Sequence, residues 1–500
     1  MPGLSELVGF ITRKFRSISA PRVDSAALAD IAREHLEEAR KLRRAGEYRA
    51  AMRACHEAVA LTGPTFDAHF QLGLNHTELL EHVAAIGHYE KAVALEPGDS
   101  DALYMLGTVL HDVSRPAESA AACERAIGVR PDFREAHFQL GLARFELADF
   151  GGAMQSFSRC FALRRGKPWD SGTLSRPDLL TSATNVDSEV EMAVNTVKIG
   201  HDIEQMEHLL AQHLLPSAFG EVIADYRHLH AEIRGTDEKS VHPFDAQRHP
   251  LVAATYKQPL YLDQTAAPPG ELLNANVDWR GMEESYLAAK PPLVAVDNLL
   301  TPKALEAVRR FCEQSTVWND IKAGYLGAYL YDGFASEALL RIAAELRERL
   351  PRIMGGQPLQ ILWGYKYDSA LPGVGIGVHA DSAAVNVNFW ITAEDANLNP
   401  DSGGLLVYSE NAPRDWSFAK YNTDPRDILQ HLQTTGASCM KVPYRANRAV
   451  IFDSDLFHAT DAPVFRPGYH NRRINITLLY GLRGAQGSAD LRGQEHGTLA

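Results

Sequence analysis

The 500-residue chain lacks the features of a secreted scaffold, a membrane-spanning protein or a nucleic-acid binder. Its five cysteines are scattered and include no Cys-x-x-Cys pair, so we expect neither a disulfide framework nor a structural zinc site, and we predict a reducing, cytoplasmic location. No run of 18 apolar residues occurs, so we expect no transmembrane segment. Acidic side chains outnumber basic ones, 63 to 50, and the net charge of −13 argues against a nucleic-acid partner.

Length and local composition predict about three domains, at roughly 100–200 residues each, with a short segment at either end. Residues 1–31 carry apolar side chains at helical spacing beside basic ones. This predicts an amphipathic helix that caps the next domain or, alternatively, lies on a membrane or serves as a transit peptide. Residues 169–290 are interpreted as a linker and a helical connector, and residues 485–500 as a polar tail.

A repeat occupies the N-terminal third. Gly73, Gly107 and Gly141 lie 34 residues apart, and each follows a leucine. A small residue stands 12 positions after each glycine, and a groove-filling residue stands 16 positions after it. Because neither helix of such a unit buries its apolar face alone, the pattern predicts stacked helix-turn-helix units. The pattern resembles the tetratricopeptide repeat over residues 32–168. The resemblance implies a concave surface that binds a protein or peptide partner, with dimerisation or a spacer role as the alternative.

From residue 291 the chain changes to short β-type runs separated by Gly, Pro and Asn. Such runs are typical of a β-sandwich or barrel with helices packed outside. We predict strands over 293–296, 359–367, 376–379, 384–392, 404–408, 449–452 and 474–480, and helices over 301–313 and 336–350. The seven histidines between residues 201 and 249 lack metal-site spacing, so they are predicted to be packed or solvated.

Two histidines and a carboxylate in the strand-rich region form a candidate metal site. His379 and Asp381 are two apart, so their side chains share a face of an extended segment, and His458 follows 77 residues after the aspartate. Two histidines and one carboxylate can bind one face of an octahedral iron. Strand alternation then groups Arg473 with Asn475 and Thr477 on one face, where a guanidinium is suited to capture a carboxylate.

His379, Asp381, His458 and Arg473 match the HxD…H…R motif, and residues 291–484 resemble the 2-oxoglutarate- and Fe(II)-dependent dioxygenases, whose members include prolyl-hydroxylase-like and phytanoyl-type enzymes. The resemblance implies a double-stranded β-helix (a jelly roll) at the C-terminus of a multidomain α + β protein. It also implies Fe(II) on the three ligands, 2-oxoglutarate paired with Arg473, O2 as co-substrate and ascorbate as a candidate reductant. Turnover would give succinate and a hydroxylated substrate C–H bond.

Other residues are predicted to complete the pocket, each with an alternative role. Tyr365 or Tyr367 donates a hydrogen bond to 2-oxoglutarate or is a core tyrosine, and Thr477 assists Arg473. Asn386 and Asn388 line the pocket or lie on a solvated face. The first functional hypothesis is a hydroxylase of a protein or peptide that the repeats recruit. The alternatives are a small-molecule oxygenase whose repeats mediate assembly, and a non-catalytic repeat scaffold with a decayed jelly roll.

Overall fold

The computed structural model describes residues 25–166, 192–236, 240–369, 371, 375–423 and 425–483. Residues 1–24 of the helix predicted over 1–31, the linker predicted up to residue 190 and the tail predicted at 485–500 therefore lie outside the described residues. The chain divides into two compact units. Unit one comprises Met1–Val113 and Arg125–Pro131, and unit two comprises Ser114–Glu124 and Asp132–Ala500.

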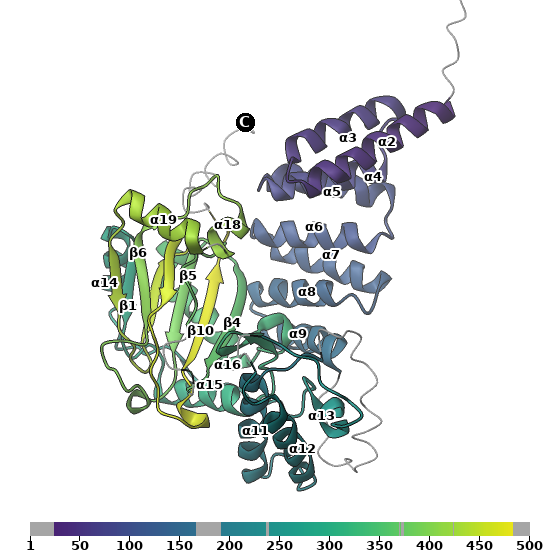
Figure 1. Ribbon diagram of the computed structural model, residues 1–500. Helices are drawn as coiled ribbons and strands as arrows, with labels where there is room; N and C mark the ends of the chain where they lie inside the picture. The colour runs from purple at the N-terminus through teal and green to yellow at the C-terminus, as the bar shows by residue number, and fades with distance from the viewer. Residues whose placement is uncertain are drawn as a thin grey trace, which may run out of the picture. The chain divides into compact units, whose positions relative to one another are not determined.

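Unit one consists of helices that pack in pairs along the chain (Figure 1). These helices are α2 (Ser25–Arg44), α3 (Tyr48–Thr62), α4 (Phe66–Glu78), α5 (His82–Leu95) and α6 (Ser100–Asp112), and α7 (Pro116–Val129) has residues in both units. The repeated glycine has a steric reason, because a Cβ at Gly73 would lie 2.6 Å from the ring of Tyr89. Since α2 begins at Ser25, repeat-like helix extends N-terminal to the predicted boundary at residue 32.

The last two repeat helices belong to unit two. α8 (Arg134–Glu146) and α9 (Phe150–Arg165) bury side chains in one hydrophobic core together with the strand-rich region; these are Leu142, Phe145, Phe157 and Phe161. Arg165 on α9 also forms a buried, two-pronged ion pair with Asp332, with N–O distances of 2.9 and 2.8 Å. The predicted domain boundary at residue 168 thus separates helices from a core to which they contribute.

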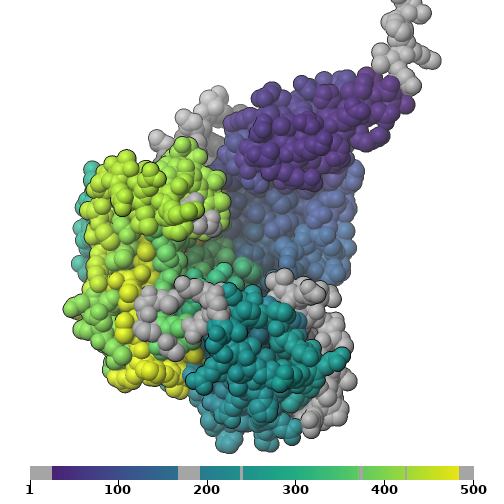
Figure 2. Space-filling view, in the orientation of Figure 1, coloured from purple at the N-terminus to yellow at the C-terminus, as the bar shows by residue number. Residues whose placement is uncertain are grey.

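The described part of the connector begins with the helices α11 (Thr196–Ala211) and α12 (Phe219–Ile233). With the short α13 (Pro250–Thr255) they enclose a small core of their own. α14 (Trp279–Ala288) packs instead into the core of the strand-rich region. Figure 2 shows the teal connector against the C-terminal part of the chain, where Arg472 donates to Glu204 at 2.8 Å.

Two antiparallel sheets form the strand-rich region. The larger has the order β1 (Leu293–Val296), β8 (Ala449–Asp453), β5 (Val385–Trp390), β10 (Ile474–Tyr480), β4 (Leu359–Tyr367), β3 (Tyr325–Tyr329) and β2 (Asp320–Lys322). The smaller has the order β7 (Cys439–Val442), β6 (Leu405–Asn411) and β9 (Leu456–Thr460). Side chains of β5 and β8 share a buried cluster with side chains of β6, so the two sheets pack face to face.

Helices cover the other face of the larger sheet. α15 (Pro302–Gln314) and α16 (Glu337–Arg349) bury their apolar sides against it, followed by the short α17 (Pro351–Met354). Alternation along β10 follows the prediction, because Ile474, Ile476 and Leu478 enter this core. α18 (Phe418–Thr423) and α19 (Pro425–Thr435) lie between β6 and β7 in the chain. No helix among the described residues is long and apolar enough to cross a bilayer.

The predicted elements differ from the fold in three places. Residues 376–379 do not form a regular strand; His379 instead makes a single antiparallel bridge with His458. His458 lies within strand β9, which was not among the predicted strands. The strands β2, β3 and β7 and the helices α18 and α19 were not predicted, because their short, mixed sequences carry no strong periodicity.

Candidate metal centre

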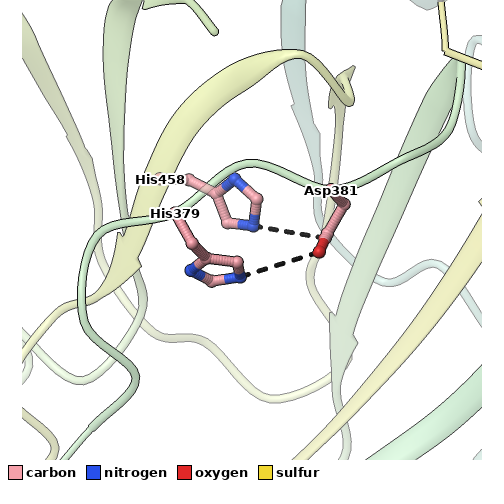
Figure 3. A group of neighbouring side chains, drawn as sticks. All are labelled: His379, Asp381 and His458. Carbon is pink, nitrogen blue, oxygen red and sulfur yellow. Dashed lines mark ion pairs between the residues drawn. The ribbon is translucent and has the colours of Figure 1, made fainter. Parts of the chain in front are cut away.

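The structure brings His379, Asp381 and His458 together between the two sheets (Figure 3). The backbones of the two histidines hydrogen-bond to each other in both directions, at 2.9 and 2.8 Å, which places their side chains side by side. Each residue offers one ligand atom, an imidazole nitrogen or a carboxylate oxygen, and these three atoms all lie within 4.8 Å of one another. Among the described residues, no other set of three or more His, Cys, Asp or Glu side chains meets this criterion.

The hydrogen bonds of the two imidazoles determine which nitrogen is protonated. Nδ1 of His379 lies 2.8 Å from the carbonyl oxygen of Gly377, and Nδ1 of His458 lies 3.0 Å from that of Leu456. Since a carbonyl only accepts, each Nδ1 donates and each Nε2 keeps its lone pair. The two Nε2 atoms lie 3.7 and 3.4 Å from the carboxylate oxygens of Asp381, so the free lone pairs and the carboxylate face one point.

Burial and the neighbouring polar groups together set the charges of His379 and Asp381. Desolvation and the neighbouring His458 lower the pKa of His379 to about 4, so that imidazole is neutral at pH 7. Burial alone would raise the pKa of Asp381, but the facing His458 and His379 and the amide of Asn386 outweigh it, and the pKa lies below its usual value. A neutral imidazole and an ionised carboxylate are the forms in which histidine and aspartate bind a divalent transition metal.

Arg473 lies in the same pocket with one nitrogen unsatisfied. Its Nε donates to the carbonyl of Gly403 at 2.6 Å and its Nη2 to that of Gly404 at 3.3 Å. Its Nη1 has no hydrogen-bond partner in the described part of the chain, although the residue is only 2% exposed. The rings of Tyr367 and Trp390 flank the guanidinium at 4.7 and 5.7 Å. A buried cation with a free donor fits an anionic ligand.

Of the other predicted pocket residues, Tyr365, Tyr367, Asn388 and Thr477 line this pocket. Asn386 was also predicted to line it but does not: it is 0% exposed and donates to Asp381. The pocket is lined by Trp363, Tyr365, Tyr367, Ile376, His379, Asp381, Asn388, Leu405, His458, Thr460, Arg473, Asn475 and Thr477. The Tyr367 hydroxyl pairs with that of Thr460 at 3.0 Å, and the Tyr365 hydroxyl lies 3.5 Å from that of Tyr329. The hydroxyl of Thr477 donates to Asn388 at 2.8 Å and not to Arg473. Arg472, the neighbour of Arg473 in the chain, lies outside this pocket and pairs with Glu204.

Sequence reasoning missed two parts of the site, the first being the lining residues Trp363, Ile376, Leu405 and Thr460. Trp363 alternates with Tyr365 and Tyr367 along β4, so the period of two could have identified it. The second part is the support of Ala380, the residue between His379 and Asp381. Its N–H donates to the carbonyl of Tyr421 at 3.0 Å, and its carbonyl accepts from the Asn422 amide at 2.9 Å. No local signal links α18 to a segment about 40 residues away in the chain.

Comparison with known proteins identifies the repeats. A sequence profile of the tetratricopeptide repeat matches residues 36–100, 81–132 and 104–160, so the N-terminal region contains tetratricopeptide repeats. No curated protein matches the chain.

Several solved structures are similar to part of the chain. One is YrrB, a TPR protein with an unusual peptide-binding site, at 23% identity and a TM-score of 0.25, over 26% of this chain and 66% of YrrB, just under two thirds. A second is the O-GlcNAc transferase of Thermobaculum terrenum, at 26% identity and a TM-score of 0.27, over 31% of this chain and 30% of that one. A third is MamA from Desulfovibrio magneticus RS-1, at 19% identity and a TM-score of 0.26, over 33% of this chain and 97% of that one.

Proposed function

We propose that the protein is an Fe(II)- and 2-oxoglutarate-dependent dioxygenase that hydroxylates a C–H bond of a protein or peptide substrate. One observation carries the proposal. A His-Asp-His cluster and a buried arginine with an unsatisfied Nη1 line the same pocket. The first group suits a divalent metal, and the second suits the carboxylate of a ligand bound beside it.

The path of the chain supports a double-stranded β-helix as the fold of this region. From β4 in the larger sheet, the chain passes to His379, which bridges to the smaller sheet, and then returns to β5. It continues through β6 and β7 in the smaller sheet, β8 in the larger, β9 in the smaller and β10 in the larger. Two packed sheets with eight strand segments that alternate in this way are typical of a jelly roll.

The residues present fit the two groups that this function requires. His379, Asp381 and His458 would hold the metal, because their free lone pairs and carboxylate converge. Arg473 would hold the distal carboxylate of 2-oxoglutarate through its unsatisfied Nη1. The flanking rings of Tyr367 and Trp390 keep water from the guanidinium, which strengthens its attraction for an anion. Fe(II) and 2-oxoglutarate, when bound, supply the oxygen activation that hydroxylation needs.

A strip of aromatic side chains supports a polypeptide substrate. It begins at Phe138 on α8, whose ring meets that of Tyr331 edge-on at 6.1 Å. Tyr331 stacks on Tyr329 at 5.2 Å, and Tyr329 reaches Tyr365, which lines the metal pocket. All of these residues belong to unit two and are partly exposed. The strip gives an extended segment of polypeptide a continuous surface from the last repeat to the metal pocket.

The test is iron-dependent formation of succinate from 2-oxoglutarate by the purified protein, with ascorbate present. We expect succinate from the wild type and its loss in His379→Ala and Asp381→Ala. His228→Ala is the matched control, because His228 lies on an exposed face of α12 and should leave the rate unchanged. Equal rates in the two site variants and the wild type, or no succinate from the wild type, would refute the proposal.

A further inference from the structure

A chain of buried amides connects Asp381 to the arginine side of the pocket. Asn386 donates from Nδ2 to Oδ2 of Asp381 at 2.8 Å, and Asn388 donates from Nδ2 to Oδ1 of Asn386 at 2.5 Å. Oδ1 of Asn388 in turn accepts from Asn475 at 2.9 Å and from the hydroxyl of Thr477 at 2.8 Å. These hydrogen bonds thus connect Asn475 on β10, two residues from Arg473, through Asn388 and Asn386 on β5 to the carboxylate of Asp381.

The carboxylate at one end fixes the direction of every bond. Because Asp381 can only accept, Asn386 must turn its NH2 group toward it and its carbonyl away. That carbonyl can only accept from Asn388, which leaves the carbonyl of Asn388 for Asn475 and Thr477. Every donor in this series of hydrogen bonds therefore points toward Asp381. Successive hydrogen bonds with the same direction polarise and strengthen one another.

Asn386 and Asn388 occupy buried positions in which apolar side chains would need no hydrogen-bond partners. Asn386 is 0% exposed and Asn388 is 5% exposed, and both lie on the inner face of β5. On the outer face of the same strand, Val385, Val387 and Phe389 enter the hydrophobic core. A buried amide is costly unless its donors and acceptors are satisfied, so amides restricted to the face of the metal cluster indicate a role at that cluster.

We propose that Asn386 is a positioning residue that fixes the rotation of the Asp381 carboxylate, and that Asn388 holds Asn386 in the orientation this requires. The inference rests on the proposed function, since it assigns the carboxylate to a bound metal. The backbone of Asp381 is held separately, by its N–H bond to Ser454 at 3.2 Å, so the amide acts on the side chain alone. Outer hydrogen bonds of this kind orient a ligand before the metal arrives.

The experiment measures the affinity of the full-length, metal-free protein for Co(II) and for Fe(II), without oxygen, by competition with a chromophoric chelator. Asn386→Ala should weaken binding about 10- to 100-fold and change the visible absorption of bound Co(II). Asn388→Ala should weaken it less, by about threefold to tenfold, because the bond between Asn386 and Asp381 survives without its support. Asn386→Leu, of similar volume, should lose as much affinity as Asn386→Ala.

Asn447→Ala is the matched control. Asn447 is also a buried asparagine of unit two, and its amide makes two bonds to Leu300, away from the metal cluster. This variant should unfold at a lower temperature yet bind Co(II) within about twofold of the wild type. If Asn386→Ala and Asn386→Leu bind Co(II) as tightly as the wild type, the positioning role is wrong and the proposed function stands. If the wild type itself binds neither metal, the proposed function fails and this inference fails with it.

Discussion

The helix pairs α4–α5 and α8–α9 carry the same repeat pattern but lie in different surroundings. In both, the recurring spacing of 16 residues places a glycine against an aromatic ring: a Cβ at Gly73 would lie 2.6 Å from Tyr89, and one at Gly141 would lie 2.5 Å from Phe157. The first pair lies in the helical unit one. The second pair shares a core with both the sheet and its covering helices, in unit two.

This difference shows that a repeat motif specifies the geometry within a helix pair but not what the pair packs against. Beyond its buried aromatics, the second pair is tied to the strand-rich region by charge. Glu146 pairs with Arg347 and accepts from the Leu359 N–H at 3.0 Å, and Arg165 pairs with Asp332. The last repeat is thus a structural part of the candidate catalytic unit as well as a member of the repeat array.

Truncation tests this comparison with the largest expected effect. A chain that begins at Ser114 keeps all of unit two and should fold and retain the metal site. A chain that begins at residue 167 loses α8 and α9 and exposes the core that Phe145, Phe157 and Phe161 fill, and removal of each such aromatic costs about 3–5 kcal/mol. We expect the second chain to be insoluble or unfolded by circular dichroism. Equal thermal unfolding of the two chains would contradict the structural role of α8–α9.

The buried ion pair of α9 gives the next largest effect. Asp332→Ala removes the carboxylate from the Arg165 guanidinium, and the two side chains are only 6% and 7% exposed. Loss of one partner of a buried pair costs about 3–5 kcal/mol, so the urea midpoint of unit two should fall markedly. Tryptophan fluorescence follows this transition, because Trp318 and Trp390 are buried in unit two. An unchanged midpoint would show that the pair contributes little to the attachment of α9.

The two repeat glycines allow a matched comparison of intermediate size. Gly73→Ala and Gly141→Ala introduce the same methyl group against an aromatic ring, which should cost about 1–3 kcal/mol in either pair. Only Gly141→Ala should destabilise the unit that holds the candidate metal site. Differential scanning calorimetry with and without added metal separates the two, since metal should shift only the transition of unit two. A lower temperature for the metal-sensitive transition in Gly73→Ala would contradict the assignment of the two helix pairs to separate units.

The smallest effect is expected at an exposed pair in unit one. Arg130 and Asp101 form an ion pair at 2.7 Å, with side chains 40% and 57% exposed. Asp101→Ala should therefore change stability by at most about 1 kcal/mol, which urea titration can place beside the Asp332→Ala result. A loss as large as that of Asp332→Ala would show that exposure does not distinguish the two pairs.

Much of this organisation follows from local sequence. The alternation along β10 predicts that Arg473, Asn475 and Thr477 share a face, and all three line the pocket. The HxD spacing and the later histidine predict a cluster that the fold assembles. The first prediction depends on the period of two along a strand, and the second on two residues two positions apart together with a histidine 77 positions later in the chain.

The rest depends on contacts between distant segments, which a single sequence does not reveal. The contribution of α9 to the core near Asp332 joins residues more than 160 positions apart. Likewise, the support that Asn422 gives to Ala380 comes from a helix without a strong pattern. The sequence also offers no way to know that Asn386 would bond to Asp381, since that bond requires the turn between His379 and β5.

Equilibrium dialysis against Fe(II) without oxygen, in the presence of 2-oxoglutarate, tests the central claim most directly. The account predicts one Fe(II) bound per wild-type chain, and loss of that iron in His379→Ala and Asp381→Ala. It also predicts that Arg473→Gln retains Fe(II) but no longer retains 2-oxoglutarate, because the unsatisfied Nη1 is removed. A wild-type chain that binds no iron, or binds it equally well without His379 and Asp381, would contradict the account.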